Sequence, residues 1–153
     1  MRLQVAPGLH LTPAQQTIVH AYRDAAEAYA RDASHPEGGG ADLARYWMGE
    51  ALAQQRAGLA DLRRGQRVVR AVPSQRSGFA VERAVVTQTT GVLVLCFHDA
   101  GVSVDRISGR IAGGLLPDQE FVVGLRRSAA RWLIAKGARY TDRPRPKAMP
   151  CLH

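Results

Sequence analysis

The sequence predicts an all-α fold, a helical bundle of about five helices that ends in a basic, extended or disordered C-terminal tail. Two observations support this prediction. Apolar residues recur at helical spacing in several segments, and residues typical of helix caps and helix ends flank those segments. Hydrophobic residues make up 46% of the 153 residues, so we expect one compact domain with a sizeable core. Within it we expect a helical platform at 1–64, a basic linker at 65–78, a second helical region at 79–137 and the tail at 138–153.

Two helices are predicted in the platform. The first has Thr12 as its N-cap, Pro13 at its first position and Gln15 as the second partner of a capping box, and it runs to about residue 32. Asp42 is the expected cap of a second, alanine-rich helix, and Gly65 is the expected stop after it. We therefore expect the two helices to be joined by the glycine-rich loop between them.

The linker combines a short candidate strand with a cluster of arginines. The strand, at Val68–Val72, is limited by Pro73 and Gly78. Five arginines without an accompanying acid lie in and just before the linker: Arg63, Arg64, Arg67, Arg70 and Arg76. The segment is either a solvated basic loop or an arm that contacts phosphates.

A third helix is predicted over residues 79–98, because a helical pattern persists over that whole length. The alternative is a buried strand at Val92–Phe97, where β-branched and aromatic residues dominate. Cys96, within this apolar run, is expected to be an unreactive core thiol. The second cysteine, Cys151, lies far away in the sequence, so we expect no disulfide framework.

Two further helices are predicted after a short turn. Ser103 is the expected N-cap of the fourth, with Ile107 and Ile111 on one face and two glycines at 113–114 after it. The fifth begins near Asp118 and stops at Gly137. Its predicted core face consists of Phe121, Leu125, Ala129, Trp132 and Leu133.

The charge of the chain indicates a polyanionic partner. The formal net charge is +8, and the basic residues are concentrated in the second part of the sequence. Five arginines and seven acids lie in residues 1–62, whereas sixteen Lys and Arg residues and six acids lie in 63–153. The excess positive charge therefore lies in the part of the chain after residue 62.

The fourth and fifth helices form a candidate helix-turn-helix. Ile107, Ser108 and Ile111, followed by Ala112 and a glycine turn, match the modest pattern of that motif. The segment from residue 92 to 137 resembles helix-turn-helix transcription regulators, in particular the trihelical regulators of phage-derived systems. These include late-gene and gene-transfer-agent activators. The segment also resembles the promoter-reading region of sigma factors.

This resemblance implies a cytoplasmic transcription regulator, an activator of phage-like genes, that binds double-stranded DNA. RNA polymerase or a second regulator protein is a further implied partner, and a homodimer is allowed. In that interpretation the bases would be read from a helix within 103–131 and the linker arginines would contact phosphates. The candidate DNA-binding residues besides those linker arginines are Arg106, Arg110, Gln119, Arg126, Arg127 and Arg131.

The alternative function is a small helical adaptor that binds RNA polymerase or another regulator protein without affinity for DNA. The acidic start of the fifth predicted helix favours it. An enzyme is not expected, because the five histidines are scattered and form no metal-binding or catalytic spacing. No cofactor, metal site or membrane association is predicted, since no apolar run approaches the length of a membrane span.

Overall fold

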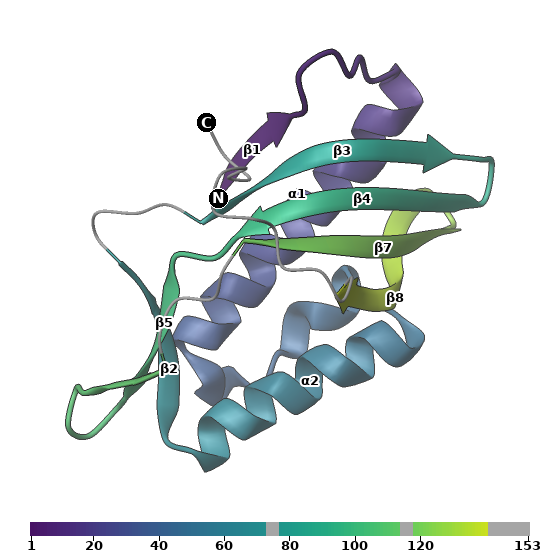
Figure 1. Cartoon of the computed structure of the whole chain (residues 1–153). Coiled ribbons are helices and arrows are strands. Elements are labelled where there is room, and N and C mark those ends of the chain that lie inside the picture. The colour runs from purple at the N-terminus through teal and green to yellow at the C-terminus, as the bar shows by residue number, and fades with distance from the viewer. Residues whose placement is uncertain (73–76, 114–117, 141–153) are drawn as a thin grey trace.

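A curved five-stranded sheet organises the fold, which contradicts the all-α prediction (Figure 1). The computed structural model describes residues 1–72, 77–113 and 118–140, the last three by their backbone alone. The strand order is β1-β3-β4-β7-β8, with β1 parallel to β3 and all other pairs antiparallel. The strands are β1 (Arg2–Val5), β3 (Gly78–Val86), β4 (Thr90–His98), β7 (Gln119–Ser128) and β8 (Arg131–Tyr140).

A smaller sheet extends from one end of the molecule. It contains β2 (Arg67–Ala71), β5 (Gly101–Asp105) and β6 (Ile111–Gly113) in the order β2-β5-β6, all antiparallel. The β5–β6 hairpin projects away from the rest of the fold at the lower left of Figure 1. The short strand predicted within the linker is confirmed as β2.

Helix α1 (Pro13–Ser34) confirms the first predicted helix. The Thr12 hydroxyl accepts a hydrogen bond from the backbone N–H of Gln15 at 3.3 Å, and the Gln15 side chain accepts one from the backbone N–H of Thr12 at 2.8 Å. These two bonds form the expected capping box, which satisfies backbone donors at the start of the helix. The fully buried Ile18 then places this end of α1 on the sheet.

A glycine in β4 allows that close approach. A β-carbon at Gly91 would lie 3.1 Å from Cγ2 of Ile18, closer than side chains normally pack. Ile18 shares its core with Leu93 and Leu95, which lie on the inner face of β4. The hydrophobic core therefore lies between α1 and the inner face of the sheet.

The second predicted helix is shorter than expected. Asp42 lies in a 3-10 helix, η2 (Ala41–Arg45), and α2 (Gly49–Arg64) begins later. The predicted stop at Gly65 is confirmed, since Gly65 caps α2. The loop between the two long helices includes a second 3-10 turn, η1 (Pro36–Gly38). In the described part of the chain, no helix combines the length and apolar character that crossing a membrane requires.

The third predicted helix is wrong, and the strand alternative at Val92–Phe97 is confirmed. Residues 78–98 form the β3–β4 hairpin, in which Leu93 and Leu95 are fully buried while Val92 is exposed. Alternating burial of this kind is the period of a strand. The turn between the strands has no glycine or proline at its tip: the Thr87 hydroxyl accepts the backbone N–H of Thr90 at 3.0 Å. The sequence pattern therefore lacked the usual sign of a turn.

The fourth and fifth predicted helices, and with them the helix-turn-helix, are also wrong. Residues 101–113 form the β5–β6 hairpin, and residues 119–140 form the β7–β8 hairpin. The β7–β8 turn contains Ala129 at φ +52°, a left-handed conformation that alanine rarely adopts. Nothing in its neighbours Ser128 and Ala130 indicated a turn, so the apolar residues on either side resembled one continuous helix.

Irregularities in strand pairing curve the large sheet. The β3–β4 register shifts between Val81 and Arg83, and the β7–β8 register shifts between Val122 and Leu125. Bulges of this kind bend a strand and increase its twist. As a result the inner face is concave toward the two long helices.

Cys96 differs from the expected free thiol. Its side chain is fully buried beside Ala80, on the face of the sheet opposite the main core, and it is disulfide-bonded. The only other cysteine of the chain, Cys151, lies outside the described residues.

The strained turn gives a first prediction. Replacing Ala129 with glycine relieves about 1–2 kcal/mol of left-handed strain and costs about 0.5–1 kcal/mol of backbone entropy. The matched change Ala130→Gly, at a residue without a positive φ, brings only the cost in backbone entropy. In urea denaturation we expect Ala129→Gly to be the more stable of the two variants, by about 1–2 kcal/mol, because the entropy cost is common to both. Equal stability of the two variants would show that the turn is not strained.

Candidate functional site: a cavity between helices and sheet

A hollow lies between the concave face of the sheet, α1, α2 and β2. Its volume is about 770 Å³. Aromatic side chains from separate elements line its apolar part: Tyr22 and Tyr29 of α1, Trp47 before α2, Phe97 of β4 and Phe121 of β7. A cavity of 300–1,000 Å³ with apolar and aromatic walls is typical of a small-molecule site.

Contacts between rings hold these walls in place. Phe97 and Phe121 pack edge to face with centroids 5.6 Å apart, and Tyr29 and Trp47 do so at 6.4 Å. Edge-to-face pairing stabilises such rings beyond the area they bury. The Tyr29 hydroxyl also reaches α2, where a β-carbon at Gly58 would lie 2.9 Å from it. The rings are therefore held apart as walls and do not collapse into the hollow.

Two short polar contacts fix the end of the cavity near β5. The Ser77 hydroxyl accepts the backbone N–H of Ala100 at 3.0 Å, and a carboxylate oxygen of Asp99 accepts the backbone N–H of Gly101 at 2.8 Å. Both Ser77 and Asp99 line the cavity. They anchor the start of β5, and the second Asp99 oxygen is not used by the Gly101 bond.

The α2 wall contributes two amides, from Gln54 and Gln55. The Gln54 amide donates a hydrogen bond to Glu50 at 3.2 Å and lies directly against Gly137 of β8. A β-carbon at Gly137 would occupy the position of the Gln54 side-chain oxygen. Gly137 therefore creates the space in which this amide sits at the cavity wall.

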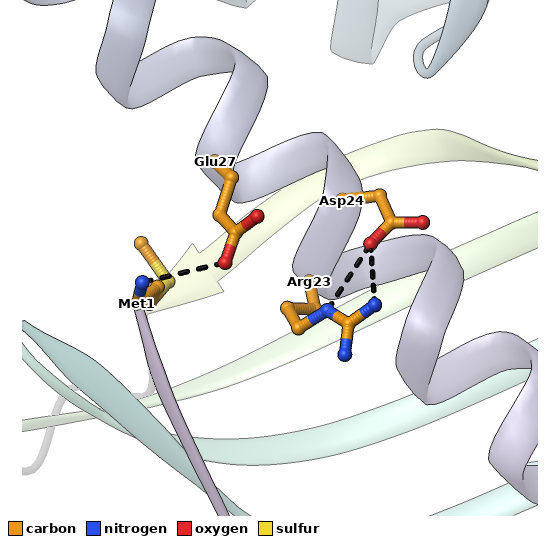
Figure 2. A network of polar contacts seen from close by, with 4 residues as sticks. All are labelled: Met1, Arg23, Asp24 and Glu27. Atoms are coloured by element: carbon orange, nitrogen blue, oxygen red, sulfur yellow. Dashed lines mark hydrogen bonds and ion pairs between the residues drawn. The ribbon is translucent and has the colours of Figure 1, made fainter.

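Charged groups surround part of the cavity rim. Met1 and Arg31 line the cavity, and the Met1 ammonium group lies 3.3 Å from a Glu27 carboxylate oxygen on α1 (Figure 2). One turn earlier on α1, Arg23 pairs with Asp24 at 2.9 Å, directed away from Met1 in Figure 2. The rim thus combines both signs of charge around an apolar interior.

The arginines of the predicted recognition helix are not among the residues that line this cavity. Arg126 and Arg127 end β7 and Arg131 begins β8, so all three lie at the hairpin turn at the right of Figure 1. Gln119, predicted to read a base, is half-buried at the start of β7 and pairs with Phe97 of β4. No helix carries these four residues, so the predicted recognition helix does not exist.

The remaining predicted arginines lie at the other end of the molecule. Arg63 and Arg64 form the last turn of α2, Arg67 and Arg70 lie in β2, and Arg106 and Arg110 lie in the β5–β6 turn. Arg76 lies outside the described residues. The backbone N–H of Arg106 donates to the carbonyl of Gln66 at 2.9 Å, which brings the β5–β6 turn against the α2–β2 connection. The structure therefore brings Arg106 and Arg110 together with the linker arginines. Arg126, Arg127 and Arg131 form a separate cluster at the β7–β8 turn. DNA binding by arginines alone stays a prediction.

One acid organises the β5–β6 turn. A single Asp105 oxygen accepts the backbone N–H of Ile107 at 3.1 Å and both the backbone N–H and the hydroxyl of Ser108 at 2.7 and 2.8 Å. The hydrogen bonds from Ser108, first from its backbone and then from its hydroxyl, hold the pKa of Asp105 below its ordinary value of 3.8. Gly109 completes the turn at φ +70°. The tip is thus held by the ionised carboxylate.

Sequence reasoning missed the cavity. It identified Phe121 as a core residue, which is correct for its burial, but the hollow depends on where β7 and α1 lie relative to each other. No local pattern encodes that placement. Within the residues that the structure describes, no three His, Cys, Asp or Glu side chains gather as metal ligands would.

Comparisons with known proteins identify a fold but not a family. No family model and no curated protein matches the chain. The crystal structure of the intermembrane space region of the chloroplast protein ARC6 matches with a TM-score of 0.56 and 11% identity, over 86% of this chain and 100% of that one. The solution structure of a de novo designed β-sheet protein matches with a TM-score of 0.39 and 16% identity, over 86% and 93%. The chain therefore shares the fold of the ARC6 region.

The cavity wall gives a second prediction. Gly137→Ala displaces only the end of the exposed, flexible Gln54 side chain, so we expect the free energy of unfolding to change by about 0.5 kcal/mol or less. Chemical denaturation measures this change. A loss of about 2 kcal/mol or more, as in an overpacked core, would show that the Gln54 amide cannot move aside.

The β5–β6 turn gives a third prediction. Because the folded pKa of Asp105 is lowered, its contribution is present above the unfolded pKa and is lost as the pH falls below about 3.8. In an acid titration followed by ¹H–¹⁵N spectra, the amides of Ile107 and Ser108 should shift with a midpoint below 3.8. Asp105→Asn should abolish that transition. A midpoint at or above 3.8 would contradict the hydrogen-bonding pattern.

Proposed function

We propose that this protein binds a small, mainly apolar molecule in the cavity between α1, α2 and the sheet. The observation that carries the proposal is the volume of about 770 Å³ with walls of aromatic side chains from separate elements. An apolar ligand gains dispersion contacts and loses unfavourable exposure to water in such a space. In this proposal the protein is a binding protein, not an enzyme.

The residues that line the cavity suit a ligand with an apolar part and a polar part. Phe97, Phe121 and Tyr22 offer ring faces and edges, which suit a ring system or a folded acyl chain. Gln54 and Gln55 offer amide donors and acceptors on the opposite wall, which suit a hydroxyl or carbonyl group of the ligand. A few placed polar groups in an apolar cavity give orientation and specificity.

The regulator and adaptor functions expected from the sequence have less support than this proposal. The regulator lost its recognition helices, and its remaining support is the excess of arginine after residue 62. The cytoplasmic location expected from the sequence is revised in this proposal. The disulfide at Cys96 favours an oxidising compartment, where such bonds persist.

A cavity-filling variant tests the proposal. Ala26 of α1 lines the cavity, so Ala26→Phe should occupy the ligand space without removing any existing contact. The probe is 1-aminoanthracene, a neutral aromatic molecule whose fluorescence rises in apolar surroundings. We expect saturable binding by the unaltered protein, and a loss of affinity of about tenfold or more in the variant, equivalent to about 1.4 kcal/mol.

The matched control is Ala14→Phe, at an exposed position in the first turn of the same helix and outside the cavity lining. It should leave probe affinity unchanged, and circular dichroism should show that both variants are folded. Equal affinity for the probe in both variants would place binding elsewhere. Absence of saturable 1-aminoanthracene binding by the unaltered protein would contradict the proposal.

A further inference from the structure

The tip of the β5–β6 hairpin exposes two large apolar side chains. Ile107 is 82% exposed and Ile111 is 68% exposed, the two highest values among the large exposed hydrophobic residues of the described chain. Figure 1 shows the hairpin projecting from the body of the protein. Burying either side chain against water would be favourable by about 1.5–3 kcal/mol, so their exposure calls for a partner.

Arginines surround these isoleucines. Arg106 and Arg110 flank the tip in sequence. The α2–β2 connection contacts the turn through the carbonyl of Gln66, and this connection has Arg63 on one side and Arg67 on the other. Glu37 pairs with Arg106. In the part of the chain that the structure describes, Arg63, Arg67 and Arg110 form no ion pair. The surface therefore offers guanidinium groups to an anionic partner.

The nearest acid of the hairpin does not neutralise these arginines. The carboxylate of Asp105 is already held by Ser108 and by the backbone of Ile107, inside the turn. That contact also fixes the direction of the tip. The isoleucines are thus presented on an ordered, convex element and not on a loose loop.

We propose that the β5–β6 hairpin is a membrane-docking element that inserts Ile107 and Ile111 between the lipids of an anionic bilayer while the surrounding arginines bind lipid phosphates. Two isoleucines on a projecting tip match a lipid interface, where apolar side chains enter and arginine stems reach back to the headgroups. A protein partner needs roughly 800 Å² of complementary surface on each side, which a narrow tip does not supply. Nucleic acid phosphates would also use the arginines, but isoleucines enter a duplex only by unstacking bases at a cost of a few kcal/mol, whereas a lipid interface accepts them without that cost.

Cosedimentation with vesicles tests the proposal. The vesicles consist of phosphatidylcholine alone or of phosphatidylcholine with phosphatidylglycerol. We expect the protein to bind the anionic vesicles and to bind the neutral ones far less. The double change Ile107→Ser with Ile111→Ser should reduce the partition coefficient at least about tenfold. Arg110→Gln and Arg67→Gln should each reduce it about fivefold and weaken its salt dependence.

The matched control is Val85→Ser with Val92→Ser, a pair of exposed valines on adjacent strands of the large sheet, 47% and 41% exposed. This control should bind anionic vesicles as the unaltered protein does. Ile107→Trp adds an independent readout: its emission should shift to the blue with anionic vesicles, after subtraction of the signal from Trp47 and Trp132.

Three outcomes would overturn the proposal. One is the absence of binding to anionic vesicles. Another is binding that the serine pair at the tip leaves unchanged. The third is tight binding of duplex DNA that depends on Arg67 and Arg110 but not on the isoleucines, without vesicle binding, which would assign this surface to nucleic acid. Since cavity binding is measured with a neutral probe in the absence of vesicles, neither result decides the other.

Discussion

The contact between α1 and β4 is the constraint on which the rest of the structure depends. Ile18 is fully buried where α1 crosses the sheet, and a β-carbon at residue 91 would lie only 3.1 Å from its Cγ2 atom. The contact joins the first helix to a central strand that pairs with both β3 and β7. The position of the helix is therefore set against three strands at once, and the other elements pack around that unit.

The cavity follows from the same arrangement. A nearly straight helix that contacts a curved sheet closely at one end leaves space further along, and the bulges at Val81 and Val122 provide the curvature. Between Tyr22 and Ser34, one face of α1 lines this space, while Ala25 and Ala28 are buried in the core. Aromatic pairs on both sides keep the space open because each ring already has a partner. The proposed binding function and the packing thus depend on the same residues.

The sequence predicted those elements whose signals are local. The capping box at Thr12, the end of α2 at Gly65 and the strand β2 all depend on residues close together in the chain. The β3–β4 and β7–β8 hairpins were missed because their turns use threonines and a left-handed alanine, Ala129, in place of the usual glycine, asparagine or proline. Without a visible turn, two apolar strands resembled one long helix.

The surroundings of the β5–β6 hairpin residues were less predictable than the fold. The basic character of Arg106 and Arg110 was visible in the sequence, but the pairing of Arg106 with Glu37 and its contact with the α2–β2 connection were not. The exposure of Ile107 and Ile111 was not indicated by the helical pattern, which only placed both on one face. Spacing along a chain shows which side chains share a face only after the period of the backbone is known.

Gly91 and Ile18 lie 73 positions apart in the sequence, but the Ile18 side chain packs in the space that a side chain at residue 91 would need. The two positions constrain each other, because a larger residue in the strand crowds Cγ2 of the isoleucine in the helix. Among relatives of this protein, the two positions are therefore expected to change together, and an alanine at 91 should accompany an alanine at 18, which has no Cγ2. Such a pair would keep the helix at the same height above the sheet, and with it the shape of the space beneath its second half.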